Sequence, residues 1–280
     1  GDQMLVLLES IAACRGFDLN HFAAQWQKHH QHDPGYIDHA TRSTLNNFKD
    51  AKSAETAGSE STDLGGAARM APLAYAYCND LDALVNSARI QTAMTHNQIL
   101  VTDSAAFFSE AVYRILQGEP PVAAIKATTS EQFNREPFQT WVNKGIESRA
   151  SETVAAVKRF GQMCEIGAAF PGVIHLVARY EDNLKDALIE NVMAGGDSAA
   201  RGMIAGMLLG AFHGLDAIPE TWLTKLAARE KIISLLADID LWASRTRGQR
   251  IDERSRPPCR EGGRNGNGSG CGRCSNAVFR

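Results

Sequence analysis

Residues 194–223 read AGGDSAARGMIAGMLLGAFHGLDAIPETWL, the most informative stretch of this 280-residue chain. A flexible Gly195-Gly196 turn delivers Asp197 to the start of a segment with helical periodicity. Three glycines then recur every fourth residue, at Gly202, Gly206 and Gly210. Because glycine costs a helix interior about 1 kcal/mol relative to alanine, we predict that another backbone packs closely against this face. The stretch therefore indicates a buried, central helix.

The chain outside this stretch also has helical periodicity almost throughout. Apolar residues spaced by three and four positions follow acidic residues that we expect to cap helices, at Asp18, Asp80, Asp103 and Asp182. In the last of these segments we expect four side chains to face the core, those of Leu184, Ala187, Leu188 and Val192. The strict alternation of a half-buried strand is absent. We predict one all-α domain of about ten helices over residues 1–244.

Residues 245–280 differ in composition from the rest of the chain. They contain nine Arg, no Lys and three acidic residues, a local charge of +6, and much of the remainder is Gly, Pro, Ser and Asn. So little apolar surface is available that burial does not offset the entropy of ordering. We predict a disordered tail over residues 245–280.

The overall composition excludes several classes of protein. With 44% apolar and 22% charged residues, the chain is an ordinary globular protein, and its net charge of −3 argues against a nucleic-acid partner. The longest apolar run, residues 203–212, is about half of a membrane span, and no secretory signal pattern opens the sequence. We therefore expect a cytoplasmic protein with no membrane partner. Three cysteines in helix-like sequence are expected to be free, buried thiols, Cys14, Cys78 and Cys164.

Asp197 has two interpretations. It is either a helix cap that accepts a hydrogen bond from a backbone N–H, or a carboxylate at the mouth of a site, where it meets a cation or a substrate hydroxyl. The helix dipole opposes a cation at this end, so one carboxylate would not hold a divalent ion. Asp2 stands in the same way at the start of the first helix. Two such carboxylates are able to converge in a helix bundle, although periodicity does not show that they do.

Other polar or small-residue segments are weaker candidates. The turn Gly65-Gly66-Ala67 has backbone N–H groups that a phosphate or ribose can approach. His96 ends a predicted helix, where a single histidine is more often a C-terminal cap than a catalyst. Asp38 is typical of a polar helix start. Three further histidines are interpreted as a solvated helix end, His29, His30 and His32.

The order of these segments resembles the ADP-ribosylglycohydrolase family. Residues 194–223 look like its C-terminal signature, a small-residue helix followed by Gly-x-x-x-Ile-Pro and an aromatic residue. Residues 64–72 resemble its Asn-Gly-Ala-Ala-Met-Arg-x-Ala-Pro segment, and Thr95-His96 resembles its Thr-His pair. Gly1-Asp2-Gln3 stands where the family carries Thr-Asp-Asp-Thr. The resemblance covers roughly residues 1–240, and the first helices of the family fold have no counterpart in it.

The resemblance implies an all-α fold with two Mg²⁺ ions in a cleft. It also implies hydrolysis of the glycosidic bond between ADP-ribose and a modified protein side chain, or of a related ADP-ribosyl compound. On this basis Asp2 and Asp197 are the candidate metal ligands and catalytic carboxylates. The candidate residues that line the ADP-ribose site are Gly65, Gly66, Ala67 and His96.

This chain also departs from the family pattern. Where the family has Asp-x-Asp followed by Thr or Ser, this sequence has Asp197-Ser198-Ala199-Ala200, and Leu64 replaces the Asn of the glycine turn. The metal site is therefore expected to be depleted. Two functions stay open: a hydrolase with weak or altered metal use, and a non-catalytic member that binds ADP-ribose or a nucleotide or is purely structural. If the chain is a fragment, we expect an exposed apolar face that causes self-association or early melting.

Overall fold

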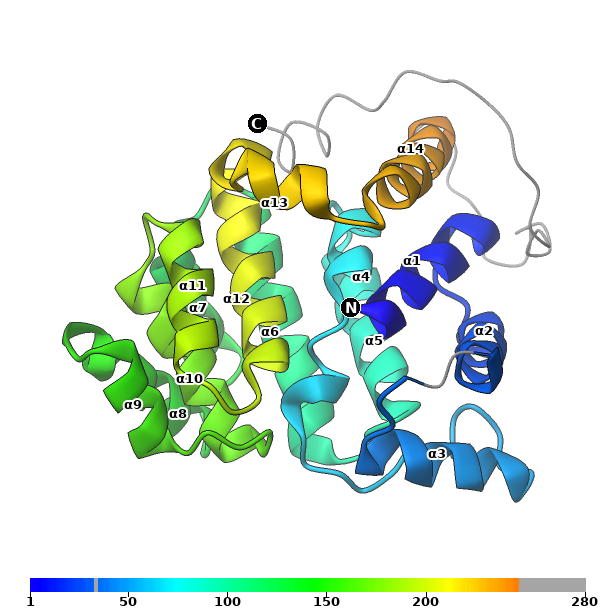
Figure 1. The fold of residues 1–280 in the computed structure, drawn as a ribbon, viewed down its shortest axis with the longest axis horizontal. Coiled ribbons are helices and arrows are strands. Elements are labelled where there is room, and N and C mark those ends of the chain that lie inside the picture. Colours follow the sequence, from blue (N-terminus) through cyan, green and yellow to red (C-terminus); the bar gives the residue numbers. More distant parts are fainter. Residues whose placement is uncertain (33–34, 247–280) are drawn as a thin grey trace.

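The computed structural model describes residues 1–32 and 35–246 (Figure 1). These residues form fourteen α-helices and three short 3-10 helices, with two isolated β-bridges and no strand among them. The predicted all-α fold class is confirmed. There are more helices than the expected ten or so, because six-residue helices are too short for a periodic pattern to be recognised in sequence.

The α-helices have the following bounds: α1 (Asp2–Cys14), α2 (Leu19–His32), α3 (His39–Lys49), α4 (Ala71–Ala76), α5 (Leu81–Ala93), α6 (Ile99–Leu116), α7 (Pro121–Glu131), α8 (Phe138–Glu147), α9 (Thr153–Phe160), α10 (Ile166–Arg179), α11 (Leu184–Met193), α12 (Ser198–His213), α13 (Glu220–Lys225) and α14 (Arg229–Thr246). The 3-10 helices are η1 (Leu64–Gly66), η2 (Ser148–Ala150) and η3 (Leu215–Ala217). The predicted tail over 245–280 lies, apart from its first two residues, outside the described residues and stays a prediction.

Several helices begin where a local capping residue predicts. Asp18 Oδ1 accepts a hydrogen bond from His21 N at 2.8 Å, and Asp80 Oδ1 accepts one from Ala83 N at 3.0 Å. Asp38 Oδ1 likewise accepts from Thr41 N at 2.6 Å, which confirms the polar start of α3. Each of these bonds closes within three residues, so the sequence alone contains all that is needed to form it.

Two predicted caps are wrong. The side chain of Gln98 caps α6, and Asp103 lies one turn inside that helix, where its buried carboxylate pairs with Arg89 and Arg135. An acidic residue near a helix start is typical of a cap, but the two arginines that pair with Asp103 lie 14 and 32 residues away along the chain. Asn183 caps α11 in place of Asp182, with its Oδ1 accepting from the backbone N–H of residue 186 at 3.0 Å.

Helix α12 occupies a central position, as the sequence predicts. It packs against α6, α10 and α11, and one of its faces is fully buried (Figure 1). Aromatic rings of the neighbouring helices form a buried cluster in the core, including Phe107 and Phe170, whose ring centroids are 5.0 Å apart. Burial of such rings is the largest stabilising contribution that a helical core of this kind offers.

The predicted close approach of a second backbone to the glycines of α12 is wrong. A Cβ on Gly202 would lie 2.7 Å from the side-chain amide of Asn191, and one on Gly206 would lie 3.6 Å from a Leu188 methyl group. A Cβ on Gly210 would meet nothing within 4 Å. The glycine face therefore borders side chains at one end and open space at the other.

Three further expectations need correction. His30 is buried, because its ring packs edge-on against Trp26 at a centroid distance of 4.5 Å, whereas a solvated helix end was predicted. Val192 is 64% exposed, because the buried face of α11 passes through Leu184, Ala187 and Asn191 and leaves the neighbouring Val192 outside it. Cys14 and Cys78 are each disulfide-bonded and not free thiols, since disulfide formation depends on proximity in the folded chain and not on spacing in sequence. The remaining described cysteine, Cys164, is free but only partly buried.

Within residues 1–32 and 35–246, no helix is long and apolar enough to cross a membrane. The expected cytoplasmic location itself stays a prediction.

Candidate functional site

The loop that precedes α4 joins two distant parts of the chain. Ser59 N donates to Thr95 O at 3.0 Å, and Asn97 N donates back to Ser59 O at 2.7 Å, which ties the loop to the end of α5. Further along, Leu64 N donates to Cys164 O at 2.9 Å, which ties it to the loop before α10. We call the region where these segments meet the junction; it comprises residues 59–70, 95–97, 161–166 and 194–197.

The Gly195-Gly196 turn completes the junction. Both glycines have positive φ, 66° and 64°, and a Cβ on Gly196 would lie 1.9 Å from the carbonyl oxygen of Gln162. Only glycine therefore lets the two backbones meet here. Asp197 N donates to that same Gln162 oxygen at 3.0 Å. The Asp197 side chain caps α12, with Oδ1 accepting from Ala200 N at 3.3 Å.

Two carboxylates act on a thiol at the junction. Cys164 is hydrogen-bonded to the side chain of Asp63, and the charge of Asp197 also acts on it. Desolvation, followed by the effect of Asp63, raises the pKa of the Cys164 thiol to about 11. Asp63 was not singled out from the sequence, although it immediately precedes the glycine turn. The fold thus brings Asp63 and the Asp197 turn to the same thiol.

Arg69 is the buried hub of the junction. Its Nε donates to Gln91 Oε1 at 2.9 Å, its Nη1 donates to Gln3 Oε1 at 2.6 Å, and its Nη2 donates to Thr95 Oγ1. Gln3 Oε1 also accepts from the indole of Trp26 at 3.0 Å. Burial lowers the pKa of Arg69 to about 10, which still leaves the guanidinium charged at neutral pH. The network fixes the start of α1 against the segment that carries the glycine turn.

The His96 ring is seated on the glycine turn. A Cβ on Gly66 would lie 2.6 Å from His96 Cγ, whereas one on Gly65 would meet nothing within 4 Å. Gly66 therefore accommodates the ring, and Gly65 faces open space. Burial, with a smaller effect of Arg69, lowers the pKa of His96 to about 4. The imidazole is neutral at pH 7, and its Nδ1 lies 2.9 Å from Thr95 Oγ1.

The expected site residues are distributed unevenly. Gly65, Gly66, His96 and Asp197 all fall at the junction. Ala67 is fully buried beneath the turn, so its side chain does not line an accessible surface. Asp2 is exposed at the first turn of α1, and in the described part of the chain its carboxylate makes no hydrogen bond or ion pair. Asp197 and Asp63 thus both act on Cys164, and no direct contact between Asp197 and Asp2 is seen among the described residues.

The residues present do not fit a pair of Mg²⁺ ions. Across the described ranges, no group of three or more His, Cys, Asp or Glu side chains is placed to hold a metal ion. Ala199 and Ala200 supply no side-chain oxygen, and Asp197 Oδ1 is already engaged as a cap. A hard dication takes about six oxygen donors. We therefore derive no chemistry through a metal at this site.

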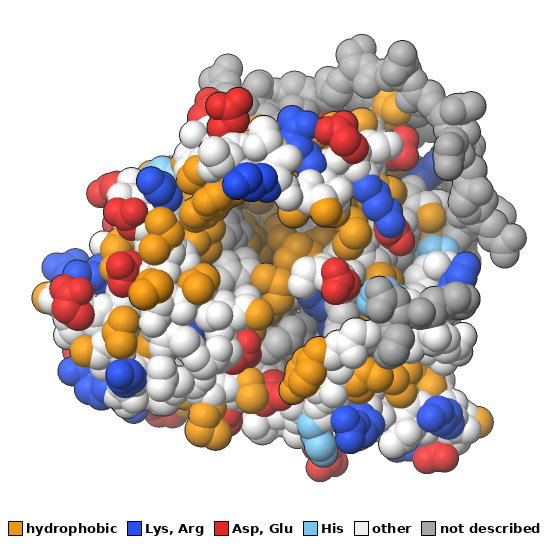
Figure 2. Space-filling model, in the orientation of Figure 1, with side chains coloured by type: hydrophobic (Ala, Val, Ile, Leu, Met, Phe, Trp, Pro, Cys, Tyr) orange, Lys and Arg blue, Asp and Glu red, His pale blue; other side chains and the backbone are white. Residues whose placement is uncertain are grey.

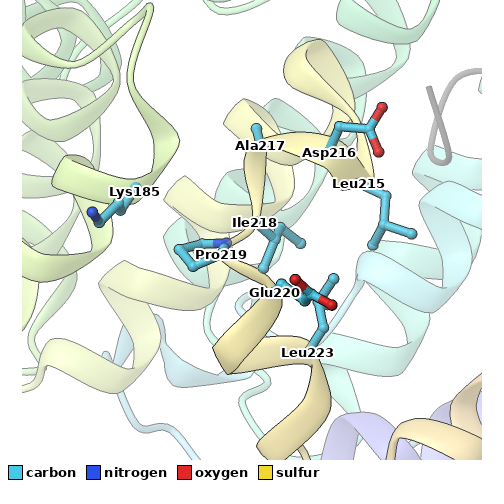
Figure 3. A pocket seen from close by; sticks show the side chains of 8 residues that line it. All are labelled: Lys185, Leu215, Asp216, Ala217, Ile218, Pro219, Glu220 and Leu223. Atoms are coloured by element: carbon cyan, nitrogen blue, oxygen red, sulfur yellow. The ribbon is translucent and has the colours of Figure 1, made fainter.

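Two pockets lie away from the junction. One, of about 440 Å³, is lined by α4, α6 and the C-terminal half of α12, including Gly206 and Gly210, and Figure 2 shows an apolar hollow near the middle of this face. Gly210 follows Asp197 by thirteen residues, or about 20 Å along the helix. The other pocket, of about 540 Å³, is drawn in Figure 3. Its charged side chains, Lys185, Asp216 and Glu220, do not point toward one another, so neither pocket offers a convergent polar site.

Comparison with known proteins gives consistent results. Crystallin J1A of Tripedalia cystophora is 24% identical over 252 residues, which cover 83% of this chain and 76% of that protein. ADP-ribosylhydrolase ARH3 of Homo sapiens is 26% identical over 265 residues, covering 77% of this chain and 70% of that protein. A solved structure of an ADP-ribosylglycohydrolase-related protein complex superposes with a TM-score of 0.68 at 25% identity. That superposition covers 85% of this chain and 78% of the solved one.

The sequence profile of the ADP-ribosylglycohydrolase family matches residues 1–250, nearly the whole chain. The match spans every helix of the described fold, including the segments that form the junction. The chain therefore belongs to the ADP-ribosylglycohydrolase family.

Proposed function

We propose that this protein binds an ADP-ribosyl group at the junction and hydrolyses the glycosidic bond that joins it to a protein side chain or a related aglycone. Family membership supports the substrate class. One structural observation carries the location: Gly65 faces open space beside a buried, neutral His96, and residues 162–164 connect the Asp197 turn to Leu64, the residue before this glycine. An open glycine backbone beside a neutral donor suits a phosphate or ribose oxygen.

The junction residues would share the chemical work as follows. The backbone at Gly65 and the His96 ring bind and orient the ADP-ribosyl group. A carboxylate, Asp197 or Asp63, accepts a proton from water as the water oxygen bonds to the anomeric carbon. The bond to the aglycone breaks, its electron pair leaves with the aglycone, and the aglycone takes up a proton from solvent. No step in this scheme requires a metal ion.

The lack of clustered metal-ligating side chains among the described residues supports a second candidate function. A non-catalytic member of the family would need only to bind ADP-ribose or a nucleotide, or to serve as a structural protein. The described residues contain no cluster of metal-ligating side chains. One relative, similar over most of this chain, is named as a crystallin. A binding protein of this kind would bind ADP-ribose without turnover. A purely structural protein would show neither binding nor turnover.

Calorimetric titration with ADP-ribose tests the location of the site. Gly65→Ala adds a methyl group to the open space without touching protein atoms, so we expect ADP-ribose affinity to fall about tenfold, or about 1.4 kcal/mol, while the fold is kept. Gly210→Ala is the matched control, since its Cβ also meets nothing within 4 Å but lies at the other end of α12. Equal affinities for the two variants would remove Gly65 from the site.

The same titration, repeated with Mg²⁺ and with a chelator, tests metal use. Because the described residues contain no cluster of metal-ligating side chains, we expect ADP-ribose to bind equally well with and without Mg²⁺. Binding that requires Mg²⁺ would show that ligands come from positions other than those described here.

Turnover of an ADP-ribosylated protein then separates the two functions. Asp197→Asn keeps a capping side chain but removes the charge, so a hydrolase that uses this carboxylate should lose about 10² to 10⁴ in rate. Equal rates for the wild type and Asp197→Asn would exclude Asp197 from the mechanism. A wild type that binds ADP-ribose but shows no turnover would establish the non-catalytic alternative.

A further inference from the structure

We propose that Arg69 and Thr95 are positioning residues that hold the His96 ring as the neutral tautomer with its proton on Nε2. His96 would then present a hydrogen-bond donor, and not a base, to an acceptor oxygen of the bound ADP-ribosyl group. The second part of this inference rests on the proposed function, whereas the tautomer can be tested without any ligand.

The Thr95 hydroxyl decides the direction of the chain of hydrogen bonds. Arg69 Nη2 donates to Thr95 Oγ1, because a guanidinium has no acceptor atom. Thr95 Oγ1 has one further partner, His96 Nδ1 at 2.9 Å. The single hydroxyl proton of Thr95 is therefore directed to Nδ1, which makes Nδ1 an acceptor. A neutral imidazole whose Nδ1 accepts carries its proton on Nε2.

Burial makes the opposite tautomer costly. Thr95 is 1% exposed, and the described residues offer its hydroxyl no acceptor other than the imidazole. If His96 carried its proton on Nδ1, the hydroxyl would accept two hydrogen bonds and its own proton would be buried without a partner. Such unpaired buried donors are disfavoured in folded proteins. The hydrogen bonds from Arg69 to Thr95 and from Thr95 to His96 therefore select the tautomer with its proton on Nε2.

Burial keeps the His96 ring neutral in spite of two nearby carboxylates. Arg69, on the segment between η1 and α4, opposes protonation of His96. Asp38, at the start of α3, and Asp63, before η1, favour protonation. Burial, together with the smaller effect of Arg69, outweighs the two carboxylates, so the pKa of His96 is lowered to about 4. Between pH 5.5 and 8 the ring is neutral, and the tautomer set by Thr95 persists over this range.

The Nε2 nitrogen of His96 keeps a small exposed area. A Cβ on Gly66 would lie nearest to Cγ and Nδ1 of His96, so this edge of the ring is the one next to the glycine turn. In the described part of the chain, Nε2 makes no hydrogen bond, yet it is not among the fully buried side-chain atoms that lack a partner. The small exposed area of His96 therefore includes Nε2. An Nε2–H group there donates to a phosphate or hydroxyl oxygen and would repel a cation.

Nuclear magnetic resonance of the imidazole nitrogens tests the tautomer directly. With ¹⁵N-labelled protein and a His96→Gln spectrum for assignment, we expect His96 to show a protonated Nε2 and an unprotonated Nδ1 at both pH 5.5 and pH 8. Thr95→Val should shift the Nδ1 resonance because it removes the hydroxyl, and Thr95→Ser should restore it. A proton on Nδ1 in the wild type, or no change in Thr95→Val, would overturn the inference. The wild-type spectrum decides the tautomer even if Thr95→Val does not fold.

Affinity for ADP-ribose tests the donor role. We expect the wild-type dissociation constant to be unchanged between pH 5.5 and 8, and to rise about tenfold in His96→Leu but much less in His96→Gln, which keeps a donor. If ADP-ribose does not bind, the proposed function and the donor role both fail while the tautomer stands. If ADP-ribose binds to a ring protonated on Nδ1, the proposed function stands and this inference is wrong.

Discussion

The Asp197 carboxylate illustrates how a structural and a chemical role meet in one side chain. It accepts the capping hydrogen bond of α12, and its charge acts on both Cys164 and Arg201. Arg201 is buried, and its Nη2 donates to the carbonyl oxygen of Gly195 at 2.5 Å. This hydrogen bond stabilises the Gly195-Gly196 turn on its buried side. Loss of activity in Asp197→Ala alone would therefore not separate an unfolded turn from a missing base.

Urea unfolding separates the capping role from the charge. We expect Asp197→Ala to lower the free energy of unfolding by about 1 kcal/mol, because α12 loses its cap, and Asp197→Asn to stay within a few tenths of the wild type. The matched pair Asp80→Ala and Asp80→Asn at the start of α5 should behave alike, since Asp80 forms the same type of bond. An equal loss for both Asp197 variants would show that the charge, and not the hydrogen bond, stabilises the turn.

The glycines of α12 show that one sequence pattern has different environments along a single helix. Gly202 lies against Asn191, whose Nδ2 donates to Ser198 O at 2.8 Å and whose Oδ1 accepts from Arg201 Nε at 3.2 Å. Gly210 borders the apolar pocket instead. Neither glycine has a positive φ, so a substitution is judged by space and helix propensity alone.

The same substitution should therefore have opposite effects at the two positions. Gly210→Ala should raise the free energy of unfolding by up to about 1 kcal/mol, because alanine favours the helix and its methyl group meets open space. Gly202→Ala should lower it, because a Cβ 2.7 Å from the Asn191 amide displaces that side chain and its two hydrogen bonds. By calorimetry, the melting temperature should be about 2–4 °C above the wild-type value for Gly210→Ala and about 2–4 °C below it for Gly202→Ala. A higher melting temperature for Gly202→Ala would contradict this account.

Across the whole molecule, two buried histidines couple stability to pH. His175 is fully buried, with Nδ1 2.7 Å from Ser148 Oγ and Nε2 3.2 Å from Thr153 Oγ1, and it links α10 to η2 and α9. Burial, with a smaller effect of two nearby arginines, lowers its pKa to about 4, and the pKa of His96 is lowered to a similar value. Both rings are neutral in the fold under conditions in which an unfolded chain begins to protonate them.

Stability should therefore decline on mild acidification. A folded pKa of about 4 against an unfolded value of 6.5 means that the unfolded state binds more protons between these limits. The free energy of unfolding should be at its full value above pH 6.5 and fall as the pH decreases toward 4, with a slope of up to about 1.4 kcal/mol per pH unit for each ring.

Urea denaturation at a series of pH values measures this slope. His175→Gln should reduce it, whereas His39→Gln, at an exposed position, should leave it unchanged. An unaltered slope in His175→Gln would assign the pH dependence to other groups. Self-association, expected if the chain is a fragment, stays a prediction, and ultracentrifugation of the same samples would measure it.

Local patterns in the sequence predicted the all-α fold, the central α12 and the caps at Asp18, Asp38 and Asp80, because such features depend on residues within one or two helical turns of one another. The glycine turn, His96 and the Asp197 turn were also found from sequence as candidates, because small residues and single polar groups stand out in apolar surroundings. The tertiary contacts that connect these segments could not be found from the sequence. Arg69 reaches Gln3 across 66 residues, and Asp63 meets Cys164 across about a hundred. Contacts of this range form only when helices pack, and spacing along a chain does not reveal which faces meet.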